Sequence, residues 1–252
     1  MRNLFVAFCL IAIIGTKAQS QEINVLLKEA DNLEKQMNEQ AAFEKYKLVI
    51  LNDAENIPAL VKATELATRI GSRATQKNDK KLLFETALSY AQRAVNAQPN
   101  NADALYALSM ASGKMTEVET ENKKIVGFVK DIKTNADKAL QINANHAKAN
   151  FSAGKWHLEM VNLNGFKKAA VKVLYGGLPP ASLDSAIYYF EKAKTADPYL
   201  MINYAELAKA YAQNNQLEKQ LVILKAMVRL PIRTFDDKLL KEEAQKQLNN
   251  LQ

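Results

Sequence analysis

Glycine, proline, cysteine and histidine are all scarce in this chain of 252 residues. It holds 8 glycines and 6 prolines, fewer than half of the roughly 12% of residues that these two supply in average proteins. This scarcity argues against β-sandwiches, β-barrels, collagen and flexible linkers. The single cysteine excludes a disulfide framework, and two histidines leave little room for a histidine-based metal or catalytic site. With 48% hydrophobic and 24% charged residues, the composition predicts an all-α globular protein.

The first twenty residues have the three-part pattern of a secretory signal peptide. A positive residue, Arg2, is followed by an apolar run over residues 4–14 and then by small and polar residues. The apolar run is too short to cross a bilayer, which takes about 20 residues. Cleavage after Ala18 or Ser20 fits the small-residue rule. Cys9 lies inside the apolar run and not at its end, so we expect no lipid attachment there.

These features predict an exported chain, periplasmic if its source is a bacterium. The signal peptide would cover residues 1–20 and a single domain residues 21–252, with an uncleaved membrane anchor as the alternative. Loss of Arg2 and Lys17 with the signal peptide would lower the net charge from +7 to +5. Such a mild excess permits weak attraction to anionic lipid or acidic protein. It shows no concentrated basic patch, so we expect no nucleic-acid partner.

From residue 22 onward, apolar residues recur at helical spacing, and one stretch carries the signature of a tetratricopeptide repeat (TPR). The spacing A-x3-F-x2-A-x4-P fits the second helix of one hairpin, in Ala186, Phe190, Ala193 and Pro198. An aromatic-x2-leucine-small-x2-tyrosine pattern fits the first helix of the next hairpin, in Tyr204, Leu207, Ala208 and Tyr211. The small residues let the helices approach closely, and the proline ends the second helix.

Weaker copies of both patterns occur upstream at a fixed separation. Each second-helix position lies 18 residues before the next first-helix start, in the steps 42 to 60, 87 to 105, 132 to 150 and 186 to 204. The separation within a hairpin varies, so insertions are expected between its two helices, where they could lengthen both. The sequence therefore predicts a TPR-like right-handed superhelix of about five antiparallel helical hairpins, with a C-terminal capping helix over residues 235–251.

The stretch from 150 to 245 resembles the regulator of microtubule dynamics family. Gly154, Trp156 and His157 carry the resemblance, together with the motif LYGGLP at residues 174–179. It implies a TPR-like helical fold. Family members are named for association with microtubules, and some act at contacts between organelle membranes and bind phospholipid through the helical-repeat domain. Because an exported chain would not meet microtubules, we do not expect the named activity to carry over.

No motif of a known catalytic or cofactor site occurs in the sequence. GxSxG, HExxH, CxxC, GxGxxG and GxxxxGK are all absent. His157 falls on a packing position of its hairpin, and His146 lies near a helix start, where a capping role is expected. Asp236 and Asp237 are expected at a helix N-terminus, where the helix dipole stabilises acidic residues. We therefore expect a non-enzymatic protein with no catalytic residue, no metal and no cofactor.

One candidate for binding is the concave groove of the superhelix. Its lining should come from residues one, five, eight and nine after each first-helix start. This register gives a mixture of basic and apolar side chains that suits a ligand with an anionic end, such as an acidic peptide terminus or a phospholipid. The candidate groove residues are Arg69, Tyr106, Met110, Lys114, Phe151, Lys155, Leu158, Lys209 and Gln213.

The other candidate is the insertion over residues 162–180, which contains no acidic residue. On a helical wheel Lys167, Lys168 and Lys172 lie opposite an apolar side, as in a basic amphipathic helix on an anionic membrane surface. Packing of that apolar side into the superhelix is the alternative. The main hypothesis is an exported module that binds a protein or peptide in its groove. The second hypothesis is a phospholipid-binding or lipid-shuttling protein that uses the groove and this insertion.

Overall fold

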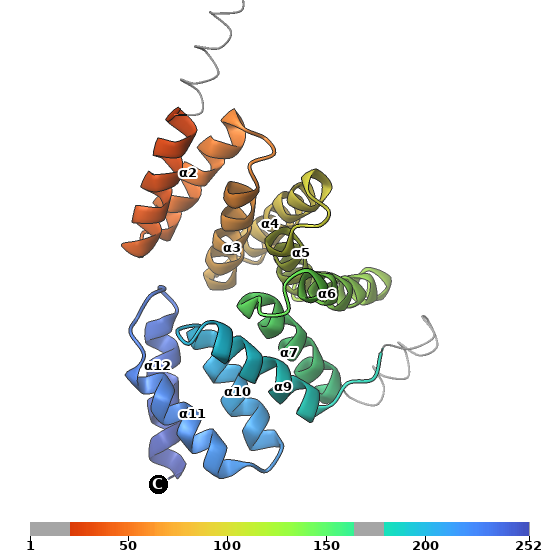
Figure 1. The fold of residues 1–252 in the computed structure, drawn as a ribbon, viewed down its shortest axis with the longest axis vertical. Coiled ribbons are helices and arrows are strands. Elements are labelled where there is room, and N and C mark those ends of the chain that lie inside the picture. The colour runs from red at the N-terminus through yellow and green to blue at the C-terminus, as the bar shows by residue number, and fades with distance from the viewer. Residues whose placement is uncertain (1–20, 164–178, 252) are drawn as a thin grey trace, which may run out of the picture.

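The computed structural model describes residues 21–163 and 179–251, which form helices joined by short turns (Figure 1). Within these ranges there is no β-strand, so the all-α prediction is confirmed. Residues 21–35 are helical and precede α2 (Glu39–Asn52), α3 (Ile57–Arg73), α4 (Lys77–Ala97), α5 (Ala102–Met115), α6 (Asn122–Ile142), α7 (Ala147–Asn162), α9 (Leu183–Ala196), α10 (Met201–Gln213), α11 (Leu217–Arg229) and α12 (Asp237–Leu251).

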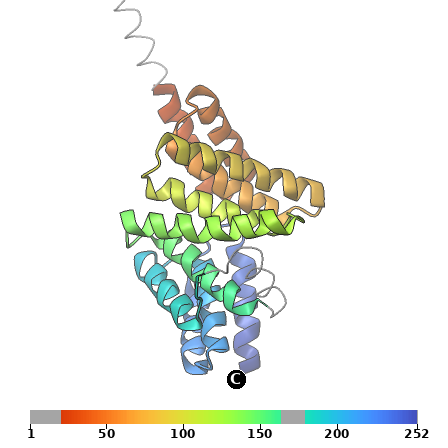
Figure 2. The same ribbon diagram turned by 90° about the vertical axis from the view of Figure 1, so that its right-hand side faces the viewer.

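Successive helices pack as antiparallel pairs, and the pairs stack along the chain. α3 packs against α4, α5 against α6, α7 against α9 and α10 against α11, while α12 covers the last pair. The first helices also contact one another from pair to pair, as α3 does with α5 and α5 with α7. Figures 1 and 2 show the stack running from the N-terminal helices at one end to α12 at the other. The predicted hairpins and capping helix are therefore confirmed.

The spacing of 18 residues links eight positions, of which seven are buried and one, Ile132, is partly exposed. Ala42, Ala87 and Ala186 of the second helices have no exposed surface, and neither has Leu60 of a first helix; Leu105 is 2% exposed. Small side chains on the second helices let neighbouring backbones approach, and the larger first-helix residues fill the space between them. The repeat in the sequence is thus a repeat of core contacts.

Side-chain caps fix the turn that leads into three of the first helices, α3, α5 and α7. The side chains of Asn56, Asn101 and His146 each accept a hydrogen bond from a backbone N–H three residues on, at 3.1, 3.1 and 3.0 Å. The capping role predicted for His146 is confirmed, and its Nε2 lies 2.9 Å from the Asp103 carboxylate. These caps satisfy otherwise unpaired N–H groups at the three helix starts. The turn into α10 has the same length but no side-chain cap.

The insertions within hairpins lengthen the second helices most. α4 and α6 each have 21 residues, whereas α2 and α9 have 14, a difference of about two turns. α3, which pairs with α4, is also long at 17 residues, whereas α5, which pairs with α6, has 14 residues. Figure 2 shows α4 and α6 as long helices lying across the stack. None of the helices in the described ranges is both long enough and apolar enough to span a membrane.

The two halves of the superhelix meet at a contact between residues far apart in the sequence. Arg73, in the last turn of α3, donates to Asp236 at 2.8 Å, and its guanidinium lies 4.8 Å from the centre of the Phe235 ring. Arg73 also pairs with Glu39 of α2. In Figure 1 the turn before α12 points toward the ends of α2 and α3. This contact brings the C-terminal helices back to the N-terminal ones.

We expect Phe235→Ala combined with Asp236→Asn to let the two halves separate. Spin labels can be attached to cysteines introduced at the exposed positions Leu51 and Leu239, in a chain with Cys9→Ser. In the double variant, double electron–electron resonance should show a longer and broader distribution of distances between the two labels. The free energy of unfolding should change by less than about 1 kcal/mol, because half-exposed ion pairs contribute little. Glu242→Gln removes a charge from the same helix and should leave the distances unchanged. Equal distributions in all three chains would contradict this role.

Candidate interaction surface

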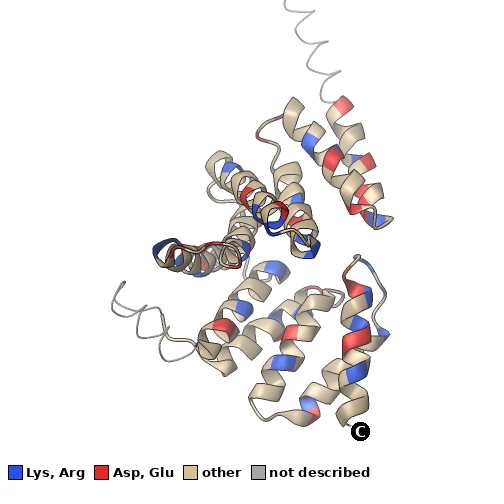
Figure 3. Cartoon of the chain, turned by 180° about the vertical axis from the view of Figure 1, so that it is seen from behind, with Lys and Arg blue, Asp and Glu red and all other residues tan. Residues whose placement is uncertain are grey.

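The first helices α3, α5, α7 and α10 meet along one face, here called the first-helix face. Lys148 of α7 pairs with Glu65 of α3. Lys155, also on α7, reaches Glu206 of α10, with 2.8 Å between Nζ and Oε1. These two pairs join helices that are far apart in the sequence. Figure 3 shows basic and acidic positions interspersed along the helices, not gathered into separate patches.

Three of the predicted groove residues come together at the N-terminal part of this face. The Tyr106 hydroxyl lies 3.2 Å from the Met110 sulfur, and the Thr68 hydroxyl, one residue before Arg69, lies 3.7 Å from the same sulfur. The ammonium group of Lys148 lies over the Tyr106 ring, 5.6 Å from its centre. Tyr106 itself is only 6% exposed, so it forms the floor of the face and not its rim.

Four more predicted residues occupy the C-terminal part. Lys155 and Lys209 flank Glu206, with ion-pair distances of 2.8 and 4.0 Å. Phe151 is half-buried against the Phe190 ring, with 6.0 Å between the ring centres. Gln213 is exposed at the end of α10. This part of the face is therefore the more accessible one.

Two predicted groove residues do not lie where the register placed them. Leu158 has no exposed surface and belongs to the buried cluster of Phe190 and Leu207, because α9 and α10 both pack against α7 and cover that position. Lys114 lies at the end of α5 over the Phe84 ring and pairs with Glu117 at 2.8 Å. The prediction is wrong for Leu158, which no ligand can contact. The basic residues Lys167, Lys168 and Lys172 lie outside the described residues.

The candidate groove residues do not include the acids that accompany the predicted cations. Arg69 lies between Glu34, at 2.7 Å, and Glu39, at 3.4 Å, which come from the first hairpin. Lys114, Lys155 and Lys209 also have carboxylate partners, as given above. The candidate list began at the second hairpin, although Glu34 lies eight residues after the first-helix start at Leu26, a position that the register rule selects. Glu39 lies on α2, a second helix, which the rule does not cover. The face is a series of ion pairs and not a basic patch.

Burial and neighbouring cations act in opposite directions on two of these acids. Burial alone would raise the pKa of Glu34, but Lys62 and Arg69 more than offset it, so its pKa lies below the usual value. Burial would likewise raise the pKa of Glu65, and Lys148 and Lys62 outweigh it, so this pKa is also lowered. Both carboxylates therefore stay ionised at neutral pH and hold the surrounding cations in place.

We expect these pairs to make the fold acid-sensitive. In the unfolded chain the two carboxyls take up protons near pH 4.5, but in the folded chain only at lower pH. Their contribution to the free energy of unfolding is therefore complete above about pH 4.5 and is lost as the pH falls through the folded-state pKa. Glu65→Gln should flatten this dependence in urea denaturation between pH 3 and 7. Glu117→Gln, at an exposed pair, should not. Equal pH dependence in both variants would contradict the account.

The described residues contain no group of three or more histidine, cysteine, aspartate or glutamate side chains placed to hold a metal ion.

Comparison with known proteins gives the family. A family model described as regulator of microtubule dynamics protein 1-3 matches residues 26–252. Regulator of microtubule dynamics protein 1 of Mus musculus is 26% identical over 246 residues, which cover 95% of this chain and 77% of the mouse protein.

Two further matches extend the comparison. Regulator of microtubule dynamics protein 2 of Macaca fascicularis is 24% identical and covers 94% of this chain, but this chain spans only 58% of that protein's length. The crystal structure of a TPR protein from Thermus thermophilus superposes with a TM-score of 0.66 at 13% identity, covering 89% of this chain and 99% of the other. At that identity the likeness shows the fold alone, and it confirms the TPR-like prediction.

These relatives correct the prediction of localisation. An exported, periplasmic chain was predicted, and this is wrong: the mouse and macaque relatives, which cover 95% and 94% of the chain, are eukaryotic proteins named for regulating microtubule dynamics, and neither is an exported protein by name. The prediction rested on residues 1–20, which lie outside the described residues. The reason given for setting microtubules aside no longer holds either. The resemblance seen in residues 150–245 extends over nearly the whole chain, which belongs to the regulator of microtubule dynamics family.

Proposed function

We propose that residues 21–252 form one non-enzymatic domain that binds a protein or peptide partner along the first-helix face. The fold shared with TPR proteins supports an interaction module. One observation carries the choice of ligand: the cations of this face are accompanied by carboxylates contributed by other helices, as Arg69 is by Glu34 and Lys155 by Glu206. A surface of alternating charge complements a polypeptide, which can offer both signs, better than a ligand of one sign.

The C-terminal part of the face is where such a partner would make contact. The Lys155 and Lys209 side chains are 36% and 49% exposed, whereas Glu206 between them is 15% exposed. Lys155 also pairs with the exposed Glu159, at 2.8 Å. An acidic group of the partner would bind Lys209 from the solvent side and take the place of Glu159 at Lys155. Glu206 would stay paired with both ammonium groups from below. The half-buried Phe151, on the same helix as Lys155, supplies an apolar contact. Arg69, by contrast, is enclosed by the acids of the first hairpin.

A phospholipid is the second candidate. The observation in its favour is that apolar side chains lie in both parts of the face, Tyr106 and Met110 in the N-terminal part and Phe151 in the C-terminal part. A phosphate needs cations in excess, however, and each of the four predicted groove cations already has a carboxylate partner. The balance of charge therefore favours a polypeptide. The lysines of the 162–180 insertion remain part of the lipid hypothesis.

A pull-down with charge-reversed variants tests the proposal. Lys155→Glu combined with Lys209→Glu should abolish capture of a partner that the unchanged chain binds and that mass spectrometry identifies. Lys219→Glu combined with Lys225→Glu makes the same change of charge on exposed positions of α11 and should keep that partner. Because the relatives are named for microtubules, sedimentation with polymerised tubulin belongs in the same series. Equal capture by both double variants would refute binding at this face.

A further inference from the structure

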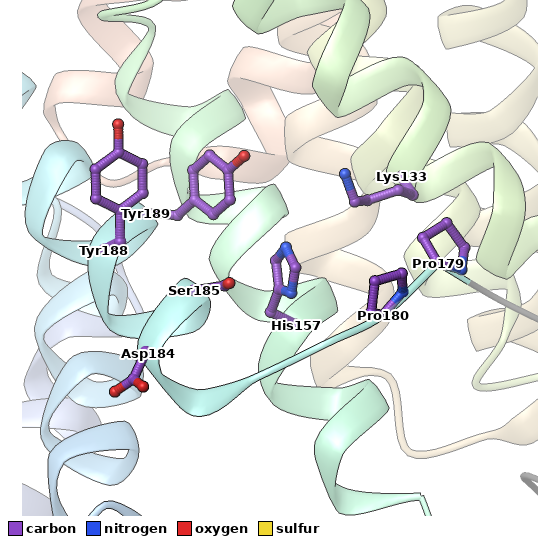
Figure 4. A pocket seen from close by; sticks show the side chains of 8 residues that line it. All are labelled: Lys133, His157, Pro179, Pro180, Asp184, Ser185, Tyr188 and Tyr189. Atoms are coloured by element: carbon purple, nitrogen blue, oxygen red, sulfur yellow. The ribbon is translucent and has the colours of Figure 1, made fainter.

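An open hollow of about 630 Å³ lies against α6, α7 and α9, and none of its lining residues belongs to the first-helix face. Figure 4 shows its wall, which the second helices α6 and α9 build together with one residue of α7 and two prolines that precede α9. The lining residues are Lys133, His157, Pro179, Pro180, Asp184, Ser185, Tyr188 and Tyr189.

His157 is the buried polar group of this pocket. Its side chain is only 6% exposed, and its Nδ1 has no hydrogen-bond partner. The imidazole stacks on the Tyr189 ring, with 5.6 Å between ring centres, and meets the Trp156 ring edge-on at 5.1 Å. Burial and the nearby Lys133 lower the pKa of His157, so the ring is neutral at neutral pH. The ring therefore lines the pocket as a neutral aromatic surface beside Tyr189.

The charges around the pocket argue against an anionic ligand. Lys133 pairs with Asp137 of the same helix, and its ammonium group lies 5.6 Å from the centre of the Trp156 ring. Asp184 adds a carboxylate at the rim, where it accepts a hydrogen bond from Asn214 at 3.1 Å. The one cation among the lining residues is therefore already matched, and a phosphate or carboxylate would meet an acid beside it.

Aromatic faces and hydroxyl donors dominate what remains of the lining. The Tyr188 and Tyr189 rings pack edge to face, with 5.2 Å between centres, and Tyr188 is 57% exposed. Ser185 accepts from the Ser182 hydroxyl at 2.8 Å, which leaves its own O–H free to donate. The pocket thus offers aromatic rings and hydroxyl groups that can donate hydrogen bonds. A matching ligand has an apolar surface and many hydrogen-bond acceptors.

A proline-rich polypeptide has this chemistry. In the polyproline II conformation it has no internal hydrogen bonds, so its carbonyl oxygens are free to accept, and its prolines carry no N–H. Its rings pack on aromatic side chains, and little conformational entropy is lost because the chain is already extended. We propose that this pocket binds a proline-rich segment of a partner protein, with pyrrolidine rings against Tyr188 and Tyr189 and carbonyl oxygens facing the hydroxyl groups. The inference does not depend on the function proposed for the first-helix face.

Fluorescence anisotropy of labelled decaproline on the full chain tests this proposal. Decaproline should bind saturably, and Tyr188→Ala should weaken binding by roughly tenfold, as loss of an aromatic anchor does at other interfaces. Tyr188→Phe keeps the ring and should lose less. Tyr199→Ala is the matched control, because Tyr199 is an exposed tyrosine, 51% exposed, that does not line the pocket. Its affinity should equal that of the unchanged chain.

A second readout locates the peptide. Trp156, the single tryptophan, contacts His157, so decaproline in the pocket should shift its emission in the unchanged chain and in Tyr199→Ala. The proposal is overturned if decaproline fails to bind at millimolar concentration, or if Tyr188→Ala and Tyr199→Ala bind it equally. Tighter binding of labelled decaglutamate, with the same Trp156 shift, would also overturn it in favour of an anion site.

Discussion

Replacing Trp156 with alanine should lower the free energy of unfolding by about 3–5 kcal/mol. The side chain is 2% exposed, and its indole N–H donates to the carbonyl of Val129 at 3.0 Å. Lys133 lies over the ring, and His157 meets it edge-on. Alanine would leave a cavity between α6 and α7 and would remove the hydrogen bond from the indole to α6, so that the Val129 carbonyl keeps only its helical partner. Because no other tryptophan is present, unfolding in urea should be followed by circular dichroism.

Tyr188→Ala serves as the control for this prediction. It also removes a large aromatic side chain, but one that is 57% exposed, so the free energy of unfolding should change by about 0.5 kcal/mol or less. A loss below about 1 kcal/mol for Trp156→Ala would mean that the indole is not packed between α6 and α7. The stacking of the third pair on the fourth would then need revision.

Gly154→Ala should destabilise the chain by about 1–3 kcal/mol, although alanine is the better helix former. A Cβ at this position would lie 2.7 Å from the ring of Phe190, which has no exposed surface and no room to move. A Cβ at Gly71 would likewise lie 2.8 Å from the ring of Phe84. In two pairs, then, a second-helix phenylalanine packs directly on the backbone of the first helix, and glycine is the residue that permits it.

Gly127→Ala is the matched control, because a Cβ there would meet nothing within 4 Å. This variant should be more stable than the unchanged chain by up to about 1 kcal/mol, which is the helix-propensity difference alone. Adding Phe190→Leu to Gly154→Ala should recover part of the loss by making room for the new methyl group. Equal stability of the two alanine variants in urea denaturation would refute the close packing at Gly154.

The architecture could be predicted because its determinants lie close together in the sequence. The alanines of the second helices, the buried leucines of the first helices and the side-chain caps at Asn56, Asn101 and His146 repeat at local spacings, and each constrains one turn or one contact. Such local patterns can be recognised in the sequence without knowledge of the rest of the fold. The predicted helix pairs follow from them.

The chemistry of the first-helix face could not be predicted in the same way. Arg69 and Glu34 are 35 residues apart, and Lys155 and Glu206 are 51 apart, with no fixed spacing that links them. Which acid meets which cation depends on how far each pair of helices is rotated on the next. The error at Leu158 has the same origin, because its burial is decided by α9 and α10. The pocket at His157 also joins residues from three helices.

Site-specific photo-crosslinking tests most directly the central claim that a polypeptide binds the first-helix face. A photoreactive amino acid would replace Gln213, which is exposed at the end of α10, or Val222, which is 64% exposed on α11. The account predicts a protein adduct from position 213 in cells and no such adduct from position 222. Adducts of lipid mass alone at position 213, or the same protein adduct from both positions, would contradict it.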